Sequence, residues 1–449
     1  MKMAVEFKVE VVSKETIKPS SPTPEEFKST FRLSLFDQLT FTLYSPILLF
    51  YSGGGGEGGG DAGGLELVSD KSRRLKSSLS DALTRFYPLA GRIKDNSWIN
   101  CSDDGVPYVE AKVNCLLEDV LAKPDPVELK KFLPIAVESL EAGTGSLLLV
   151  KASFFNCGGL AIGVCISHKI TDVAGLGTFI RAWVGSARVE SSDEVVVPDF
   201  TISSAFPPRD DLKDLPVAEL PKGQCVTRRY VFDSSKVTAL RAKASSPTVP
   251  QPTRVEAVSA LIWKSVSNAS RRKLSAPSRQ SVLSQAVNLR RRLAHPLPEH
   301  SVGNLVGGFM ARNEDPGTDL LCLVSNLRAS MKDYVESYPK RLQGGLESTA
   351  KAVFEAGVQF GSLMNSDDID FYNCSSWCGL PFYEADFGWG KPVWVGRDES
   401  EFKNSFVLID AKDGEGIEVW LTLTERDMAE LDHDQELLEF TSLNPSITW

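Results

Sequence analysis

The sequence predicts an α/β protein built from two similar domains, each a mixed sheet with helices. At 449 residues the chain is too long for one ordinary hydrophobic core and suits two domains of roughly 200 residues each. Stretches with strand character alternate with amphipathic helical stretches in both halves, which is typical of α/β proteins. Hydrophobic residues make up 42% of the chain and charged residues 24%, the profile of a globular protein.

An irregular segment divides the two halves. Residues 187–223 contain the stretch SSDEVVVPDFTISSAFPPRDDLKDLP, which is rich in proline and charge and is typical of a crossover between domains. We therefore expect an N-terminal domain at 1–186 and a C-terminal domain at 224–449. Paired strands expected at 146–166 and 406–423 indicate a similar plan in both, although no repeat exists at the level of residues.

The first half begins with three expected strands and one helix. The strands cover residues 7–12, 31–35 and 47–51. A flexible surface loop is expected at the glycine tract 53–64, because its glycines lack the strand-turn-helix context of a phosphate-binding loop. The helix that follows ends before Pro88, and its apolar face is formed by Leu75, Leu79, Leu83 and Phe86.

Two buried strands complete the first half. They cover residues 146–155 and 160–166 and are joined by the turn Cys157-Gly158-Gly159. The second of these strands leads directly into Ser167 and His168. An amphipathic helix then follows, whose apolar face is formed by Leu176, Phe179, Ile180 and Trp183.

The second half repeats the alternation of strands and helices. The expected strands cover residues 226–232, 280–289, 406–411 and 417–423. Asp233 is placed to cap a helix, and Thr253 with Glu256 has the spacing of a capping box for the next one. A hairpin turn at 412–416 precedes the last strand, in which apolar and polar residues alternate.

The composition argues against several classes of function. The formal net charge of -10 speaks against a nucleic-acid partner, which would require a basic surface. Residues 1–26 contain no apolar stretch long enough for a signal peptide, and no part of the chain approaches the ~20 apolar residues of a membrane span. We therefore expect a cytoplasmic protein with no membrane partner.

The cysteines give no sign of disulfides or of a metal site. Eight cysteines are spread along the chain without regular spacing, so we expect reduced and mostly buried thiols. Cys374 and Cys378 are four residues apart, but no histidine lies near them in the sequence and no second pair exists. No metal ligand is therefore expected.

One of the four histidines stands out by its position. His295 and His300 flank prolines in a polar stretch, and His433 lies among acidic residues. His168 instead ends a buried strand just before a helix, where a rigid core can present a side chain at a crevice. It could act there as a general base near neutral pH. The alternative is a structural histidine bonded to a nearby carbonyl group.

Asp172 also has two interpretations. It could work together with His168, or it could simply cap the following helix. The pattern is not that of a hydrolase triad, because Ser167 is adjacent to His168 on a strand and should point to the opposite face. No GxSxG sequence occurs in the chain.

Two motifs resemble signatures of the plant BAHD acyltransferases. His168-Lys169-Ile170-Thr171-Asp172 matches HxxxD, and Asp386-Phe387-Gly388-Trp389-Gly390 reads DFGWG near the C-terminus. The resemblance extends over nearly the whole chain. Further matching segments lie at residues 33–37, 86–92, 285–290, 376–378 and 382–385.

The resemblance implies a fold, a reaction and a co-substrate. The fold would be chloramphenicol acetyltransferase-like, with an active-site channel between the two domains. His168 would deprotonate the hydroxyl of a small-molecule alcohol, which attacks the thioester of an acyl-CoA in a ternary complex without an acyl-enzyme. No permanently bound cofactor is implied. The most similar members acetylate alkaloid and other specialised-metabolite alcohols, so acetyl-CoA is the first donor to test.

The resemblance also assigns structural residues around the site. Asp172 would point away from the channel and pair with Arg292 or Arg290, which stiffens the loop that carries His168. The DFGWG residues Asp386, Phe387, Gly388, Trp389 and Gly390 would shape the coenzyme A side without taking part in the chemistry.

The acceptor pocket is less defined by sequence. Members that bind acidic acceptors carry an arginine where this chain has Gly379, which makes a carboxylate-bearing acceptor doubtful. A flat or apolar alcohol is favoured by the aromatic residues Phe36, Phe309, Phe382 and Tyr383, each of which could equally belong to the core.

Three functions remain open from the sequence. The first is an acyl-CoA-dependent alcohol O-acyltransferase, the second an amine N-acyltransferase, and the third a catalytically inactive binding homologue. Intact His168 and DFGWG argue against the third. The enzyme is expected to be a monomer.

Overall fold

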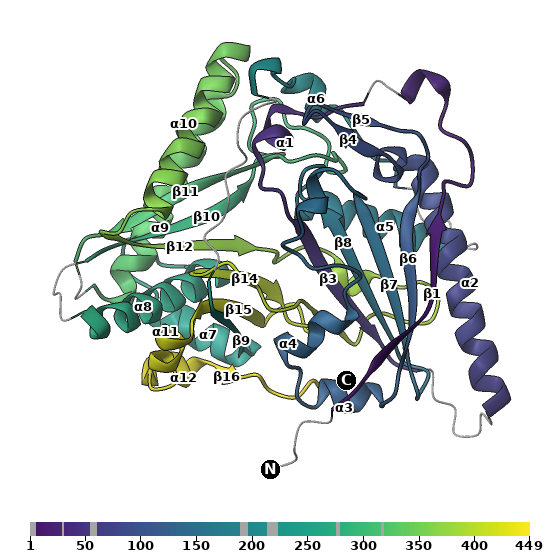
Figure 1. Ribbon diagram of the computed structural model, residues 1–449. Helices are drawn as coiled ribbons and strands as arrows, with labels where there is room; N and C mark the ends of the chain where they lie inside the picture. Colours follow the sequence, from purple (N-terminus) through teal and green to yellow (C-terminus); the bar gives the residue numbers. More distant parts are fainter. Residues whose placement is uncertain are drawn as a thin grey trace.

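The computed structural model describes residues 6–28, 31–53, 61–188, 196–212, 223–274, 279–315 and 318–449, without the side chains of 61–65 and 272–274. Two large mixed sheets and one small sheet form its framework, with helices packed on their outer faces (Figure 1). This confirms the predicted α/β class.

The first large sheet has six strands. Their spatial order is β1 (Val9–Ile17), β6 (Val106–Val113), β7 (Leu148–Phe155), β8 (Leu160–Ser167), β3 (Tyr44–Tyr51) and β13 (Trp394–Gly396). Every residue of β3 and β8 is buried, as expected for strands covered on both faces. The end of β8 is therefore anchored in the interior.

The second large sheet has seven strands. Their order is β11 (Val306–Asn313), β10 (Gln280–Asn288), β12 (Ile369–Ser376), β14 (Ser405–Asp410), β15 (Ile417–Thr424), β9 (Cys225–Phe232) and β16 (Ser442–Leu443). The inner strand β12 runs parallel to both of its neighbours. A small third sheet contains β2 (Phe31–Arg32), β5 (Trp98–Asn100) and β4 (Arg92–Lys94).

The longer helices flank the sheets on their outer sides, whereas α4 (Pro126–Leu129) lies between the two large sheets (Figure 1). The helices that precede β9 in the chain are α1 (Leu35–Leu39), α2 (Asp61–Arg85), α3 (Leu117–Leu121), α4, α5 (Val173–Ala187) and α6 (Ile202–Ala205). Those of the second half are α7 (Ser234–Lys243), α8 (Arg254–Leu274), α9 (Leu320–Arg341), α10 (Leu346–Met364), α11 (Glu425–Leu431) and α12 (Gln435–Phe440). Short 3-10 helices cover Glu25–Phe27, Tyr87–Ala90, Lys130–Phe132, Leu140–Gly143, Asp210–Leu212 and Phe382–Glu384.

Each large sheet has its own hydrophobic core, and the sheets also pack on one another. Leu421 and Val419 of β15 belong to the core under α8 and α9. Trp420 of the same strand and Ile409 of β14 belong to the core of the first sheet. Alternate residues of the second sheet therefore face its own helices or the first sheet.

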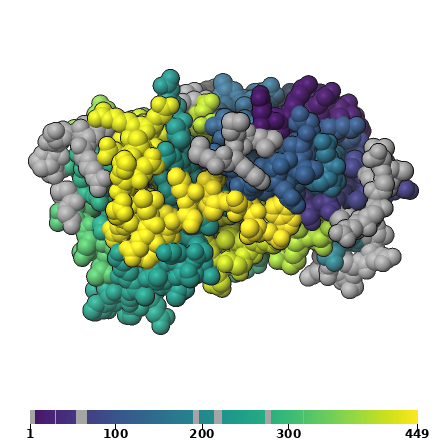
Figure 2. Space-filling view, turned by 90° about the horizontal axis from the view of Figure 1, so that it is seen from below, coloured from purple at the N-terminus to yellow at the C-terminus, as the bar shows by residue number. Residues whose placement is uncertain are grey.

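The C-terminal half also contributes directly to the first sheet. In β13, residues 394–396 pair with residues 48–50 of β3. The chain end crosses between the two halves, as the yellow band in Figure 2 shows. Arg229 of β9 donates to the carbonyl of Pro445 at 2.9 Å, and the N–H of Ile447 donates to the carbonyl of Leu121 at 2.8 Å.

Most expected elements are present, with their ends shifted by a few residues. Both predicted helix caps are made: Asp233 accepts from the N–H of Lys236, and Thr253 and Glu256 bond each other's backbone N–H groups. The expected strand at 31–35 is wrong beyond Arg32. A capping box between Ser34 and Asp37 starts α1 instead, since Ser and Asp at this spacing satisfy the first N–H groups of a helix.

Three other expected segments are described wholly or in part. The strand expected at 417–423 is β15, and its residues up to Leu423 are all buried, because the face with its polar residues lies against the first sheet. The loop expected at the glycine tract 53–64 lies mostly outside the described residues and is wrong at 61–64, which form the start of α2. The crossover expected at 187–223 is described only at 187–188, 196–212 and 223, and the domain boundaries placed on either side of it remain predictions.

No helix within the described ranges is long and apolar enough to cross a bilayer. The same residues contain no group of three or more His, Cys, Asp or Glu side chains that could hold a metal ion.

Candidate active site

His168 lies directly after β8, between the sheet and α5. Its N–H donates to the carbonyl of Leu43 at 2.8 Å, and its own carbonyl accepts from Asn304 Nδ2 at 2.6 Å. The backbone is therefore fixed on both sides. The residue is partly exposed, and its enclosed Nδ1 has no hydrogen-bond partner among the described residues. This contrasts with a structural histidine, whose ring nitrogens are normally satisfied by hydrogen bonds.

Burial lowers the pKa of His168 from its ordinary 6.5. The Asp172 charge and the Asn304 amide both act to raise this pKa, but desolvation of the imidazolium outweighs them. The neutral imidazole is therefore the main form at neutral pH, which is the form that a general base needs.

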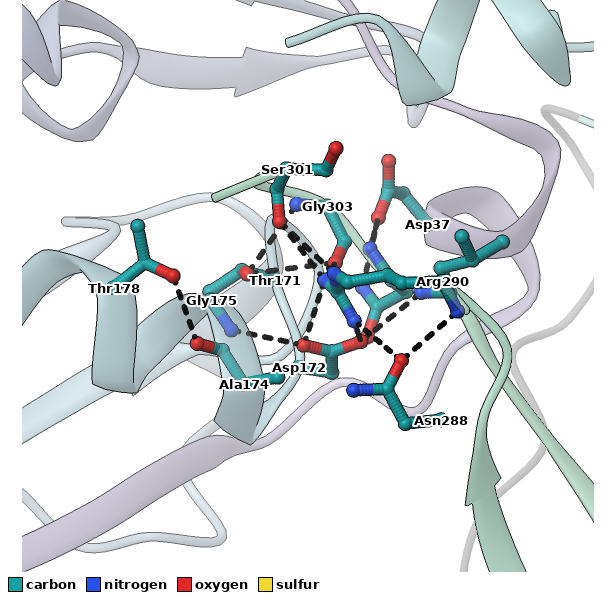
Figure 3. Close-up of polar contacts among 12 residues, drawn as sticks. Asp37, Thr171, Asp172, Ala174, Gly175, Thr178, Asn288, Arg290, Ser301 and Gly303 are labelled. Atoms are coloured by element: carbon teal, nitrogen blue, oxygen red, sulfur yellow. Dashed lines mark hydrogen bonds and ion pairs between the residues drawn. The ribbon is translucent and has the colours of Figure 1, made fainter. Parts of the chain in front are cut away.

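Asp172 is both a helix cap and one partner of a buried ion pair (Figure 3). Its Oδ1 accepts from the N–H of Gly175 at 3.0 Å, which caps α5. The two carboxylate oxygens also receive the Arg290 guanidinium, at 2.7 Å and 3.0 Å. Asp172 therefore caps the helix and pairs with an arginine at the same time.

Of the two candidate arginines, Arg290 makes the pair. Arg292 is exposed and donates to the carbonyl of Asn288 at 2.6 Å. Burial acts to raise the pKa of Asp172, but the charge and hydrogen bonds of Arg290, with the N–H groups of Gly175 and Leu305, hold it below 3.8. A bidentate, fully hydrogen-bonded carboxylate of this kind stays ionised.

The ion pair also organises the segment that precedes β11. Arg290 donates to the carbonyl of Ser301 at 3.0 Å and 3.1 Å, and to that of Gly303 at 2.9 Å. Gly303 has a φ of 138°, which few residues other than glycine adopt. A Cβ at this position would lie 3.1 Å from the Ile202 side chain of α6. The crossover helix is thereby packed against the segment behind the active site.

Asn304 and Asp37 are site residues that sequence reasoning did not identify. Asp37 Oδ1 accepts from the N–H of Asn304 at 2.7 Å and from its Nδ2 at 2.8 Å. The same amide nitrogen donates to the carbonyl of His168. Asp37 belongs to the 33–37 segment, so the family resemblance was the one available signal. An asparagine far along the chain carries no such signal.

Lys169 is a buried lysine beside the histidine. Its Nζ donates to the carbonyls of Gln38 at 2.8 Å and Thr40 at 3.2 Å, at the end of α1. Burial lowers its pKa to about 8, against the opposing effect of the Asp37 charge. The lysine thereby ties α1 to the loop that carries His168.

The DFGWG residues form a turn on the core of the first sheet. Asp386 Oδ1 accepts from the N–H groups of Gly388 at 2.8 Å and Gly390 at 2.9 Å. Phe387 is fully buried, with its ring centroid 4.9 Å from that of Trp183 in α5. Trp389 stacks on Phe387 at 5.5 Å. These contacts are structural, and none of the described hydrogen bonds joins the turn to the His168 loop.

The four aromatic residues proposed for the acceptor pocket do not form one cluster. Phe36 and Phe309 lie in the core of the second sheet. Phe382 lies in the core of the first sheet, and Tyr383 packs against it. The Tyr383 hydroxyl accepts from the N–H of Val395 at 3.2 Å. The core alternative is favoured most clearly for Phe309, which shares its side of the second sheet with Ala311 and Leu283.

Comparisons with known proteins identify a family and several similar relatives. The model of the "Transferase family" matches residues 7–438. The chain is 39% identical to vinorine synthase of Rauvolfia serpentina over 431 residues, covering 94% of this chain and 96% of the relative. It is 38% identical to stemmadenine O-acetyltransferase of Catharanthus roseus over 438 residues, covering 95% and 96%.

Solved structures resemble the fold over its full length. The crystal structure of vinorine synthase matches with a TM-score of 0.84 at 36% identity, covering 98% of this chain and 100% of the other. The structure of F. sporotrichioides TRI101 complexed with Coenzyme A and T-2 matches with a TM-score of 0.71 at 19% identity, covering 92% and 99%. At this low identity, the similarity to TRI101 shows a shared fold and nothing more.

Proposed function

The chain belongs to the Transferase family of BAHD acyltransferases, and we propose that within this family it acetylates a hydroxyl group of an apolar plant specialised metabolite. The family uses acyl-CoA as co-substrate, so the chain is an acyl-CoA-dependent O-acyltransferase. Alkaloids and terpenoids are the first acceptor classes, because the relatives include "Salutaridinol 7-O-acetyltransferase" and "Limonoid 21-O-acetyltransferse".

His168 acts as the general base in this proposal. The neutral imidazole takes the proton from the acceptor hydroxyl as the oxygen attacks the thioester carbonyl. When the resulting tetrahedral intermediate collapses, the C–S bond breaks, and the imidazolium returns the proton to the departing thiolate. The products are the ester and free coenzyme A. The observation that carries this assignment is a partly exposed histidine at the end of a buried strand, with its backbone fixed on both sides.

The transfer is direct, in a ternary complex. An acyl-enzyme would need an activated thiolate or serine. Burial raises the pKa of the buried thiol of Cys165 well above its ordinary value, and that of Cys378 to about 12. Both cysteines are therefore poor nucleophiles at neutral pH. Asp172, Arg290 and the DFGWG turn have structural functions in this proposal.

The test is a screen of acyl donors against an alcohol panel, followed by product mass spectrometry. Acetyl-, malonyl-, benzoyl- and hydroxycinnamoyl-CoA are offered with alkaloid and terpenoid alcohols and with amine analogues. Release of coenzyme A that requires both an alcohol and His168 supports the proposal. Acylation of amines alone would identify an N-acyltransferase, and no transfer with any donor would identify an inactive homologue. The monomeric state and the cytoplasmic location remain predictions.

A further inference from the structure

Arg397 is a buried cation without a polar partner. It directly follows β13 and is 9% exposed. Its guanidinium carbon lies 5.4 Å from the centroid of the Trp377 ring, but no hydrogen bond or ion pair joins it to the residues that the structure describes. The buried arginines Arg229 and Arg290, by contrast, each make several hydrogen bonds. A buried guanidinium without acceptors is unfavourable, which indicates a binding function.

The nitrogen atoms of Arg397 are not fully enclosed. The described buried polar atoms that lack a partner do not include them, so the guanidinium retains contact with accessible space. The aromatic contact holds the guanidinium in place on one side, as in cation–π pairs. The donors of the fork remain available on the other side.

The register of the first sheet gives the position of Arg397 relative to His168. Gly396 pairs with Leu48, and Leu48 pairs with Gly163 of β8. Both β13 and β8 run toward the same end of the sheet, and His168 follows β8. Arg397 is level with the residue after Gly163, about 13 Å along the strand direction from His168 and roughly 10 Å across two strand spacings.

The part of the second sheet that faces the first sheet carries several partly exposed residues. On the inner strand β12, Asn373 and Ser375 point to the same face as Trp377 and remain partly exposed. On the neighbouring strands Ala286 pairs with Gly308, and both are partly exposed. A Cβ on Gly308 would come no closer than 3.5 Å to any neighbour. Small and polar residues therefore line this part of the face.

Two carboxyl groups act on Arg397 electrostatically without bonding it. Asp398 and Glu138 both interact with it electrostatically, while burial lowers its pKa. Asp398 is itself 2% exposed with an unpartnered Oδ1, and burial raises its pKa to about 7. An incoming anion would be repelled by these carboxyl groups wherever they are ionised. What the guanidinium lacks is hydrogen-bond acceptors.

We propose that Arg397 determines acceptor specificity by donating hydrogen bonds to a neutral carbonyl oxygen of the alcohol substrate, remote from the hydroxyl that is acylated. A ketone, an ester or a lactone has the required chemistry. This inference rests on the proposed acyl transfer and adds a substrate class to it.

Three benzyl alcohols of the same shape test the proposal with acetyl-CoA as donor. They carry a para-acetyl, a para-isopropyl or a para-carboxyl group. In the wild-type enzyme kcat/KM is expected to be about tenfold to hundredfold higher for the ketone than for the isopropyl compound, as for a hydrogen bond to a charged donor. In Arg397→Met, which keeps an apolar chain over Trp377, this ratio falls to about one.

The control is Arg291→Met, the same substitution at an exposed arginine; it should keep the wild-type ratio. A ketone-to-isopropyl ratio near one in the wild-type enzyme would overturn the proposal while leaving the acyl transfer intact. A preference for the carboxylate that is lost in Arg397→Met would also overturn it, in favour of anion recognition.

A binding measurement decides the case in which none of these alcohols is acetylated. The dissociation constants of the ketone and the isopropyl compound are measured by ligand-observed NMR with the wild-type enzyme and with Arg397→Met. Tighter binding of the ketone that disappears in the variant supports the recognition by Arg397 even without turnover. Equal binding of both compounds contradicts it.

Discussion

His168 and Asp172 share one short loop but are held in opposite ways. The carboxylate of Asp172 is saturated by hydrogen bonds from Arg290, Gly175 and Leu305. The ring of His168 keeps a nitrogen without a partner, while its backbone is bonded on both sides. The loop is thus made rigid around a histidine that remains partly exposed, which suits the presentation of a base.

Removal of the base should abolish most turnover without unfolding the protein. For His168→Ala we expect a loss of at least about 100-fold in kcat, in the range found for general bases. Thermal unfolding and circular dichroism should show an intact fold. Near-normal turnover in a folded variant would contradict the assignment of His168.

The pH profile should report the lowered pKa of His168. Because burial favours the neutral ring, the acid limb of log(kcat/KM) should have its midpoint below pH 6.5. Activity falls as the pH drops through this value, since protonation removes the base. The unfolded chain binds this proton more readily than the folded one, so stability also declines as the pH falls below 6.5. An acid limb above pH 6.5 would speak against this environment.

Asp172 and Arg290 should be energetically coupled. Asp172→Asn keeps a capping oxygen but leaves the guanidinium without its counter-charge, a loss of about 3–5 kcal/mol for a buried pair. Arg290→Met should cause a similar loss, and the double variant should lose less than the sum. The same cycle with Arg292→Met is the control, because this arginine is exposed and bonds a backbone carbonyl. Equal coupling to both arginines would contradict the pair seen here.

At the scale of elements, the segment from Ser301 to Leu305 connects the two halves behind the active site. Its carbonyls accept from Arg290, its Asn304 holds both Asp37 and His168, and its Gly303 packs on α6. The start of α1, the end of β8 and the approach to β11 are thereby held in one arrangement. The histidine is positioned by three elements that are distant in sequence.

Asn304→Asp should disturb this arrangement selectively. The new carboxylate cannot donate to the His168 carbonyl and would face the buried Asp37, whose pKa burial already raises. We expect kcat to fall by at least about tenfold, since small errors in the position of a base are costly. Asn288→Asp is the matched control, because Asn288 serves Arg290 as an acceptor and Asp keeps that function. Equal losses in the two variants would contradict a positioning function of Asn304.

Local patterns identify elements well where a single rule dominates. The capping residues Asp233 and Thr253 and the buried strands around residues 146–166 are predictable because cap spacing and unbroken apolar runs are strong signals. The strand expected at 31–35 fails because two short signals compete: apolar residues favour a strand, but the Ser34 and Asp37 cap determines the structure. The burial of the polar positions of β15 depends on the facing sheet, which no local pattern indicates.

At the scale of the whole molecule, a buried ion pair lies between the two sheets. Arg229 of β9 donates to Glu418 of β15 at 2.6 Å and 3.1 Å, and both side chains are almost completely buried. Trp394 of β13 donates from Nε1 to the same carboxylate at 3.2 Å. The Arg229 guanidinium lies 5.2 Å from the ring centroid of Trp394. The strand from the C-terminal half is thus fixed to both sheets.

Arg229→Met should destabilise the enzyme strongly, because it leaves the carboxylate of Glu418 buried and unpaired. A loss of about 3–5 kcal/mol is expected, measurable by chemical denaturation. The neighbouring Arg228→Met is the control: Arg228 pairs with Asp432 near the surface, where such pairs contribute about 0–1 kcal/mol. Similar losses of stability in the two variants would show that the buried pair contributes no more than the surface pair.

Contacts between residues that are distant in the chain are the feature that the sequence predicts least. The HxxxD and DFGWG residues are visible in the chain because a family resemblance marks them. Arg290 was one of two alternatives, and only the fold distinguishes them. Asn304, Arg397 and the partners Arg229 and Glu418 carry no local signal, because their chemistry depends on strands brought together from distant parts of the chain.

The late position of β13 has a consequence for biosynthesis. The edge of β3 that it covers stays unpaired until residues 394–396 have left the ribosome, although N-terminal domains generally fold first during synthesis. An open edge on a strand this rich in apolar residues is prone to pairing with other chains. Nascent chains that stop before residue 394 are therefore expected to be protease-sensitive and to aggregate, whereas full-length chains close the sheet as translation ends.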